Sequence, residues 1–287
     1  MLSPWLELPG ADERLGSWSE AIGLDLIRLG TTATAEEITD TAITQPLVVA
    51  ATLLAFDEVT KRGLLTGKTT VTAGHSVGEI AAYSIAGVLT ADDAVTLAAT
   101  RGAEMAKACA TEPTGMAAVL GGDEAEVLAR LDALDLVPAN RNAAGQIVAA
   151  GAISALDKLV EDPPAKARVR KLATAGAFHT HYMASALDGY SAAAQSVTAG
   201  EPSTTLLSNA DGQPVESAAD AMTKLVAQLT RPVRWDLCTA TMGQREVTAI
   251  IEFPPAGTLV GIAKRELRGV PTYAVKTPAD LDGLSEL

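Results

Sequence analysis

A serine flanked by glycines is the strongest candidate for chemistry in the sequence. Residues 74–78 read Gly-His-Ser-Val-Gly, with Ser76 at the centre. A β-branched run at 69–73 predicts a strand before the serine, and the apolar run from Ile80 predicts a helix after it. At such a strand-to-helix turn the hydroxyl is exposed, and the Val77 N–H can stabilise an oxyanion. We predict that Ser76 is a nucleophile; a glycine-flanked turn with a solvent-facing serine is the alternative.

A serine nucleophile needs a base, and the chain contains three histidines. His75 adjoins Ser76, so its side chain is expected to point elsewhere. His179 and His181 lie far downstream, and serine before histidine is the order found in other enzymes with this turn. From position alone the base is one of these two histidines, unless both lie on the surface.

The composition narrows the class of protein. A chain of 287 residues, 48% of them hydrophobic, is long and apolar enough for a large core, so disorder is excluded. The net charge of −13 argues against nucleic acid as the main partner. The longest apolar stretch, near 80–89, is too short to span a bilayer, and the first residues do not read as a signal peptide. Cys109 and Cys238 have no metal-type spacing. We expect a cytoplasmic protein without a metal, a membrane attachment or a nucleic-acid partner.

The elements that must position these residues alternate between helix and strand, which predicts an α/β fold. Helices are expected at 45–59 and from 92 to about 110, and further strands of the main sheet at 205–208 and 247–252. The middle of the chain predicts the order βαββαβ, which is the ferredoxin-like pattern. Its elements are expected at 116–120, 123–134, 136–142, 146–150, 153–160 and 167–172. We predict a large subdomain of residues 1–114 and 177–287, with a small subdomain, 115–176, inserted in it.

Six ordered segments resemble the malonyl-CoA:acyl carrier protein transacylase family of bacterial fatty-acid and polyketide synthesis. The resemblance covers nearly the whole chain, and the combination is far more specific than any one segment. The segments are GHSVGE at 74–79, RG with a methionine at 101–105, NRNAAGQIVAAG at 140–151, AFH at 177–179, QL followed by PVRW at 228–235, and EFPPAGTL at 252–259. The last departs from the family's usual acidic-glycine-proline-glycine loop.

The resemblance implies a fold and a reaction. The fold is an α/β-hydrolase-like core with an inserted ferredoxin-like subdomain, and the active site lies in the gorge between them. Ser76 would attack the thioester of malonyl-CoA and carry the malonyl group as an ester. His179 would be the base, and the acyl group would pass, by a ping-pong mechanism, to the phosphopantetheine thiol of acyl carrier protein. Coenzyme A enters as a substrate thioester, and no permanently bound cofactor is expected.

The resemblance also assigns roles around the two catalytic residues. A planar guanidinium at Arg101 would hold the malonyl carboxylate through two hydrogen bonds, although a surface salt bridge is an alternative role for it. A backbone carbonyl of Arg234 or a neighbour would orient the histidine, in place of an aspartate. Phe178 would exclude an α-methyl group or simply pack in the core, and Asn142 would line the pocket or stabilise a turn. The substrate-binding set is Arg101, Val77, Phe178, Asn142, Gln45 and Met105.

One family feature is missing from the sequence. Family members normally begin with a strand that leads to a GQGxQ loop, whose second glutamine supplies an oxyanion donor, and this sequence contains no such motif. We expect either a truncated start or a second donor from elsewhere. Two rival functions remain open: an acyl-carrier thioesterase that uses the same Ser-His pair, and a module that binds a carrier protein without chemistry.

Overall fold

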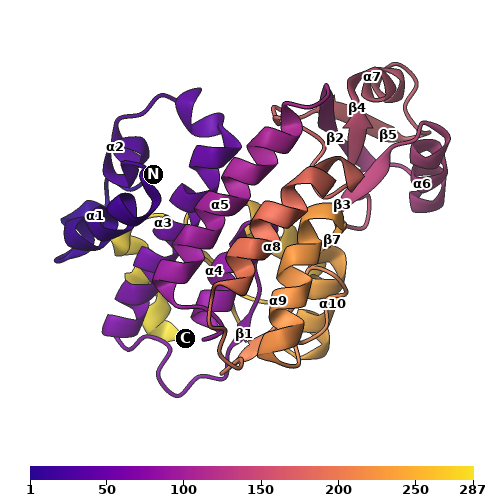
Figure 1. Ribbon diagram of the computed structural model, residues 1–287. Helices are drawn as coiled ribbons and strands as arrows, with labels where there is room; N and C mark the ends of the chain where they lie inside the picture. The colour runs from indigo at the N-terminus through magenta and orange to yellow at the C-terminus, as the bar shows by residue number, and fades with distance from the viewer.

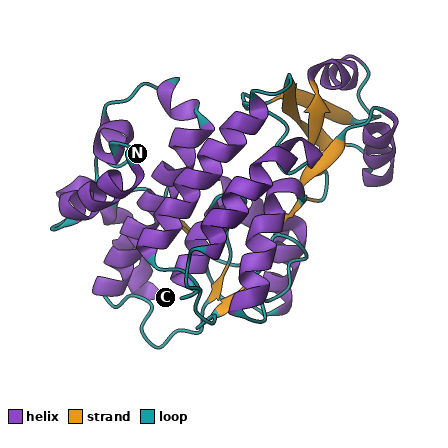
Figure 2. Cartoon of the chain, in the orientation of Figure 1, coloured by secondary structure: helices purple, strands orange, loops and turns teal.

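Helices make up most of the chain, and the longest strands gather at one end of the molecule (Figure 2). This computed structural model describes residues 1–287, except for the side chain of Glu286, and its architecture is mixed α/β. The α-helices are α1 (Ala11–Ile22), α2 (Leu26–Thr31), α3 (Thr41–Lys61), α4 (Gly78–Ile85), α5 (Ala91–Cys109), α6 (Glu124–Ala133), α7 (Ile153–Glu161), α8 (Leu187–Gln195), α9 (Ala218–Ala227), α10 (Trp235–Gln244) and α11 (Thr258–Glu266). Short 3-10 helices are η1 (Trp5–Glu7), η2 (Glu37–Thr39), η3 (His181–Ala186), η4 (Gln228–Thr230) and η5 (Pro278–Glu286).

The strands form three sheets. They are β1 (Val71–Thr72), β2 (Thr114–Gly121), β3 (Val137–Ala143), β4 (Gln146–Ala152), β5 (Ala167–Lys171), β6 (Thr205–Leu206), β7 (Val233–Arg234), β8 (Ile250–Glu252) and β9 (Thr272–Ala274). The largest sheet has the order β5-β2-β4-β3-β7. Its first three strand pairings are antiparallel, and β7 joins β3 in parallel. The middle of the chain therefore has the predicted order of elements.

Side chains pack against both faces of the five-stranded sheet. One face packs under α6 and α7, around a small core that includes Val119, Leu131 and Leu156. The opposite face carries Met116 and Val148, and Phe178 packs against this side. In Figure 1 these strands and the two helices form a lobe at the upper right, beside the larger helical body. The sheet thus connects the lobe to the segment around residue 178.

The larger body is built around α3 and α5. Alanines and leucines of both helices share one large core with α4. The two helices approach so closely that a side chain on Gly102 would lie 2.5 Å from the Thr41 carbonyl oxygen. By length and apolarity α3 could also cross a membrane, although 56% of the window that meets this test is buried inside the protein. A buried core helix passes the same test.

The main sheet differs from the prediction. Strands at 205–208 and 247–252 were expected to extend one sheet, and both segments do contain strands. However, β6 pairs with β1, and β8 pairs with β9, as two separate parallel pairs. Among the residues that the structure describes, no ladder joins these pairs. Strands of two or three residues have few backbone N–H and C=O groups left to form hydrogen bonds with a further strand.

Candidate active site

Ser76 occupies the turn between β1 and α4. Its φ is 53°, in the left-handed region that a residue with a side chain rarely adopts. The turn is tight because a side chain on Gly74 would lie only 2.0 Å from the Gly78 carbonyl oxygen. A side-chain amide also binds the backbone here, since the Ser76 N–H donates to Asn209 Oδ1 at 2.9 Å. The sequence therefore folds the serine into the strained turn that the glycine spacing predicts.

The imidazole of His179 lies against the serine hydroxyl. Ser76 Oγ is 2.7 Å from His179 Nε2, and His179 Nδ1 is 2.9 Å from the Gln228 carbonyl oxygen. The second contact fixes the tautomer, because only a protonated Nδ1 can donate to a carbonyl. Burial, and to a smaller extent the nearby charge of Arg101, lowers the pKa of His179 to about 3. A neutral Nε2 is thus placed to accept the serine proton.

The two downstream histidines differ in their surroundings. His179 is buried, with 2% of its surface exposed, whereas His181 lies on the surface at the start of η3. His75, the third histidine, points away from Ser76, and its Nε2 lies 2.9 Å from Asn142 Oδ1. Of the three histidines, which the structure describes in full, only His179 contacts the serine hydroxyl.

The prediction that the Arg234 carbonyl orients the histidine is wrong at that residue. The carbonyl belongs to Gln228, in the QL portion of the same segment. The chain turns in η4 after α9, and this turn directs the Gln228 carbonyl toward His179. Arg234 lies in β7, where its N–H donates to the Asn209 carbonyl at 2.8 Å and its side chain pairs with Asp236.

Arg101 is a buried cation that only neutral groups contact. It is 1% exposed, and it donates to Gln45 Oε1 at 2.6 Å, to Gln228 Oε1 at 2.7 Å and, at 3.5 Å, to Ser76 Oγ. Within the described part of the chain no carboxylate pairs with it, and its Nε has no partner. Burial lowers the pKa of Arg101, which shows how poorly its charge is solvated. An anion beside Ser76 would relieve this cost.

The remaining predicted residues surround the pair at different depths. Val77 precedes α4, and its N–H makes no hydrogen bond with the residues that the structure describes. Gln45 contacts Arg101 directly, and Met105 lies behind it, with Gln45 Nε2 3.4 Å from the sulfur. Phe178 is half-buried next to His179. Asn142 contacts His75 and not the Ser-His pair, so it lies one residue further from the hydroxyl.

Three buried polar residues of the site carried no predicted role. Glu79, Asn209 and Gln228 form hydrogen bonds with one another beneath Ser76. Glu79 and Gln228 stand within the GHSVGE and QL segments, and Asn209 directly follows an expected strand. A carboxylate at the start of an otherwise apolar helix was the available signal. The arrangement as a whole brings a serine hydroxyl, an imidazole and a buried guanidinium into one cluster, the geometry that a nucleophile, a base and an anion site require.

Known proteins are similar in sequence to this chain over its whole length. Residues 16–279 match the acyl transferase domain family. A malonyl CoA-acyl carrier protein transacylase from Mycolicibacterium smegmatis is 80% identical over 100% of both chains. A protein of the same name from Mycobacterium tuberculosis is 72% identical over 100% of this chain and 95% of its own. This chain belongs to the malonyl CoA-acyl carrier protein transacylase family. The sequence-based resemblance is thereby confirmed.

Solved structures of the transacylase family have the same fold. The crystal structure of MCAT from Mycobacterium tuberculosis matches with a TM-score of 0.98 at 72% identity, over 99% of this chain and 94% of that one. A malonyl-transacylase solved in complex with a type II PKS acyl-carrier protein matches with a TM-score of 0.93 at 27% identity, over 100% of this chain and 94% of that one. The mixed α/β fold is therefore that of the transacylase family.

Proposed function

We propose that this chain transfers malonyl from malonyl-CoA to the phosphopantetheine thiol of acyl carrier protein through a malonyl ester on Ser76. One observation carries the proposal: a Ser-His pair at 2.7 Å lies beside a buried Arg101 that has only neutral partners. The names of the relatives support the reaction, and a relative solved with an acyl-carrier protein supports the second substrate.

The first half-reaction acylates the serine. Ser76 Oγ attacks the thioester carbon while His179 Nε2 takes the hydroxyl proton, and the Val77 N–H stabilises the oxyanion. The carbon–sulfur bond then breaks, and His179 gives the proton to the departing sulfur, which leaves as the thiol of coenzyme A. The Gln228 carbonyl holds Nδ1–H throughout, so the imidazole keeps its orientation. An uncharged orienting group makes this a Ser-His dyad.

The second half-reaction repeats these steps with a different thiol. His179 takes the proton of the phosphopantetheine thiol, and the sulfur attacks the malonyl ester. The bond to Ser76 Oγ breaks and the serine regains its proton from His179. Both thiols use the same base, so one site serves both substrates in turn and ping-pong kinetics follow.

Arg101 selects an acyl group that carries a carboxylate. Its guanidinium is held by Gln45 and Gln228 within 3.5 Å of the serine oxygen, so a malonyl carboxylate would reach it while the ester forms. Acetyl has no carboxylate and would leave the cation unpaired. We assign pocket-lining roles to Met105, Phe178 and Asn142. The Phe178 ring would disfavour an acyl group with a methyl on its α-carbon by about 1–3 kcal/mol.

We also infer the finer organisation of the chain. The strand order β5-β2-β4-β3 with intervening α6 and α7 supports a ferredoxin-like small subdomain at 115–176. The remaining residues, 1–114 and 177–287, form an α/β-hydrolase-like subdomain that carries Ser76 and His179. Two unpaired cysteines support a reducing, cytoplasmic location. Fatty-acid and polyketide synthesis are the pathways that fit, and no permanently bound cofactor is required.

A product analysis tests the proposal against its closest rival. Purified protein is incubated with malonyl-CoA and a phosphopantetheinylated acyl carrier protein, and malonyl-carrier and free malonate are quantified together. Malonyl-carrier should be the main product. Free malonate as the main product, with or without carrier, would instead identify a hydrolase.

A further inference from the structure

We propose that Glu79 is a positioning residue for malonyl selectivity, because its carboxylate fixes the direction of the Gln228 amide and thereby the hold on Arg101. The inference rests on the proposed function. Glu79 stands three positions after Ser76, and it contacts neither the Ser76 hydroxyl nor the Arg101 guanidinium. Its action is therefore indirect, through Gln228.

Glu79 is buried and uses both carboxylate oxygens as acceptors. It is 1% exposed on the first turn of α4. Its Oε1 accepts from the Asn209 N–H at 2.6 Å, and its Oε2 accepts from Gln228 Nε2 at 2.5 Å. A buried carboxylate is retained only where donors satisfy it. Both donors here belong to residues that contact the catalytic turn.

The Gln228 amide has only one direction that satisfies its neighbours. Its Nε2 faces three acceptors: Glu79 Oε2 at 2.5 Å, the Ser76 carbonyl at 3.1 Å and Asn209 Oδ1 at 3.2 Å. Its Oε1 accepts from Arg101 at 2.7 Å. A reversed amide would place its NH₂ against the guanidinium and its oxygen against three acceptors. The carboxylate is the charged member of these acceptors, so it contributes most to the observed direction.

Gln228 serves the two parts of the site through different atoms. Its side-chain oxygen holds Arg101, and its backbone carbonyl holds His179 Nδ1. Reversal of the side-chain amide leaves the backbone carbonyl in place. Loss of the Glu79 carboxylate should therefore weaken the carboxylate site for the acyl group and spare the Ser-His pair.

The test substitution is Glu79→Gln, which preserves shape but replaces one acceptor with a donor. If the new NH₂ faces Gln228, two NH₂ groups oppose each other unless the Gln228 amide reverses to present its oxygen. The reversal turns the Gln228 NH₂ toward Arg101, where two donors then face each other. If the new NH₂ faces the Asn209 N–H instead, the loop that binds Ser76 is disturbed. The first arrangement is the one expected, because a side-chain amide reverses more readily than a backbone segment moves.

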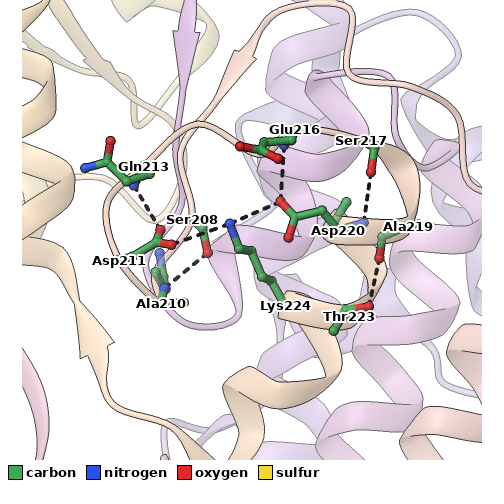
Figure 3. A network of polar contacts seen from close by, with 12 residues as sticks. Ser208, Ala210, Asp211, Gln213, Glu216, Ser217, Ala219, Asp220, Thr223 and Lys224 are labelled. Carbon is green, nitrogen blue, oxygen red and sulfur yellow. Dashed lines mark hydrogen bonds and ion pairs between the residues drawn. The ribbon is translucent and has the colours of Figure 1, made fainter.

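A matched control is available nearby, at the surface of the same region. Asp220 on α9 pairs with Lys224 at 3.1 Å, and Lys224 also reaches Asp211 at 3.5 Å. Figure 3 shows these side chains joining the loop on either side of Asn209 to α9, whose end leads to Gln228. Asp220→Asn is also an acid-to-amide change, but Asp220 contacts none of Glu79, Gln228 and Arg101.

The experiment compares two acyl donors in three proteins: wild type, Glu79→Gln and Asp220→Asn. The readouts are kcat/KM for malonyl-CoA and for acetyl-CoA, the rate of Ser76 labelling by a fluorophosphonate, and the melting temperature. For Glu79→Gln we expect kcat/KM for malonyl-CoA to fall roughly ten- to hundredfold. Acetyl transfer and serine labelling should change by less than about threefold. Asp220→Asn should match wild type in selectivity.

Two outcomes would overturn the proposal. An equal loss for malonyl-CoA, acetyl-CoA and the fluorophosphonate would show that Glu79 only supports the fold. Unchanged selectivity would show that the carboxylate does not direct the amide. Failure of the proposed function is distinguishable, because the wild-type protein would then form no malonyl-enzyme at all.

The wild-type protein gives a second test that needs no variant. Burial raises the pKa of Glu79 to about 7, against the lowering effect of its two hydrogen bonds. Protonation removes one acceptor, so the ratio of malonyl to acetyl kcat/KM should fall as the pH drops below about 7. A flat ratio between pH 8 and pH 5.5 would contradict the proposal. The charged groups close enough to act electrostatically on Glu79 are the cations Arg101 on α5 and Lys224 on α9. Tyr83, Tyr190 and Cys238 are the other titratable groups that interact with it; their pKa values are raised, so they stay neutral in this range.

Discussion

At the scale of single residues, the proposed selectivity for malonyl depends on the charge of Arg101. Two glutamine oxygens hold the guanidinium in place but leave its charge uncompensated. A planar group with two parallel donors matches a carboxylate, and the ammonium of lysine cannot reproduce that geometry. The residue is therefore a candidate for the step at which malonyl is distinguished from uncharged acyl groups.

Arg101→Lys should lower kcat/KM for malonyl-CoA by about a hundredfold, because one buried pair of hydrogen bonds to the carboxylate is lost. Acetyl-CoA should be affected much less. Arg62→Lys is the matched control, since among the described side chains Arg62 pairs only with Glu58 and Asp282, at the surface. Equal losses for both donors would argue against a role in selecting the carboxylate.

The depressed pKa of His179 makes a separate prediction about pH. Because burial and Arg101 lower that pKa to about 3, the imidazole is already neutral at pH 5. Protonation, which would block the base, begins only as the pH approaches 3. The rate of Ser76 labelling by an uncharged fluorophosphonate should therefore stay nearly constant from pH 7 to pH 5. A fall with a midpoint near 6.5, the ordinary value for histidine, would contradict this account.

The residues also show what could be read from the sequence. Ser76, His179 and Arg101 stand in local motifs, so their positions could be predicted. The partner of His179 could not be fixed to one residue, since η4 turns the carbonyl of Gln228, and not that of Arg234, toward the ring. Glu79 and Asn209 meet across 130 positions of sequence. No local spacing records such a contact.

At the scale of elements, close helix packing positions Arg101. Gly102 follows it on α5 and lies against the first turn of α3, where a side chain would approach the Thr41 carbonyl oxygen to 2.5 Å. Gln45 projects from that same part of α3 and accepts from Arg101. The distance between the two helices therefore sets the geometry of the guanidinium. Periodicity predicts both helices, but the distance between them depends on the absence of a side chain at Gly102.

Gly102→Ala should destabilise the protein by about 1–3 kcal/mol, because the added methyl group meets backbone that cannot move freely. It should also reduce malonyl transfer by shifting Gln45 away from Arg101. Gly16→Ala is the control, because Gly16 is exposed in α1 and no atom lies within 4 Å of the Cβ that alanine would add. This variant should be more stable than wild type by about 0.5–1 kcal/mol. Chemical denaturation measures both. A neutral Gly102→Ala would show that α3 and α5 can separate without cost.

At the scale of the whole molecule, the small lobe is attached close to the turn that carries Ser76. β7 pairs with β3, so a strand from the large body completes the sheet of the lobe. Asn142 on β3 binds His75, the residue before Ser76, and His75 also lies edge-on to Trp235. Further out, Gln146 accepts from Arg265 on α11. The order of elements in the lobe could be predicted from turns and periodicity, but these attachments are long-range and could not.

Asn142→Ala should lower the free energy of unfolding by about 1–3 kcal/mol, since it leaves Nε2 of the half-buried His75 without its partner. Gln146→Ala removes an exposed link between the same two parts and should cost no more than about 0.5 kcal/mol. Urea denaturation compares them. Similar small losses in both variants would indicate that the His75 contact does not fasten the lobe.

The most direct measurement of the central claim is the intact mass of the protein after brief exposure to malonyl-CoA. The account predicts a stoichiometric increase equal to one malonyl group in the wild-type protein. It predicts no increase in Ser76→Ala and loss of the adduct when a phosphopantetheinylated carrier protein is added. A wild-type protein that gains no mass, or a Ser76→Ala variant that gains the same mass, would contradict it.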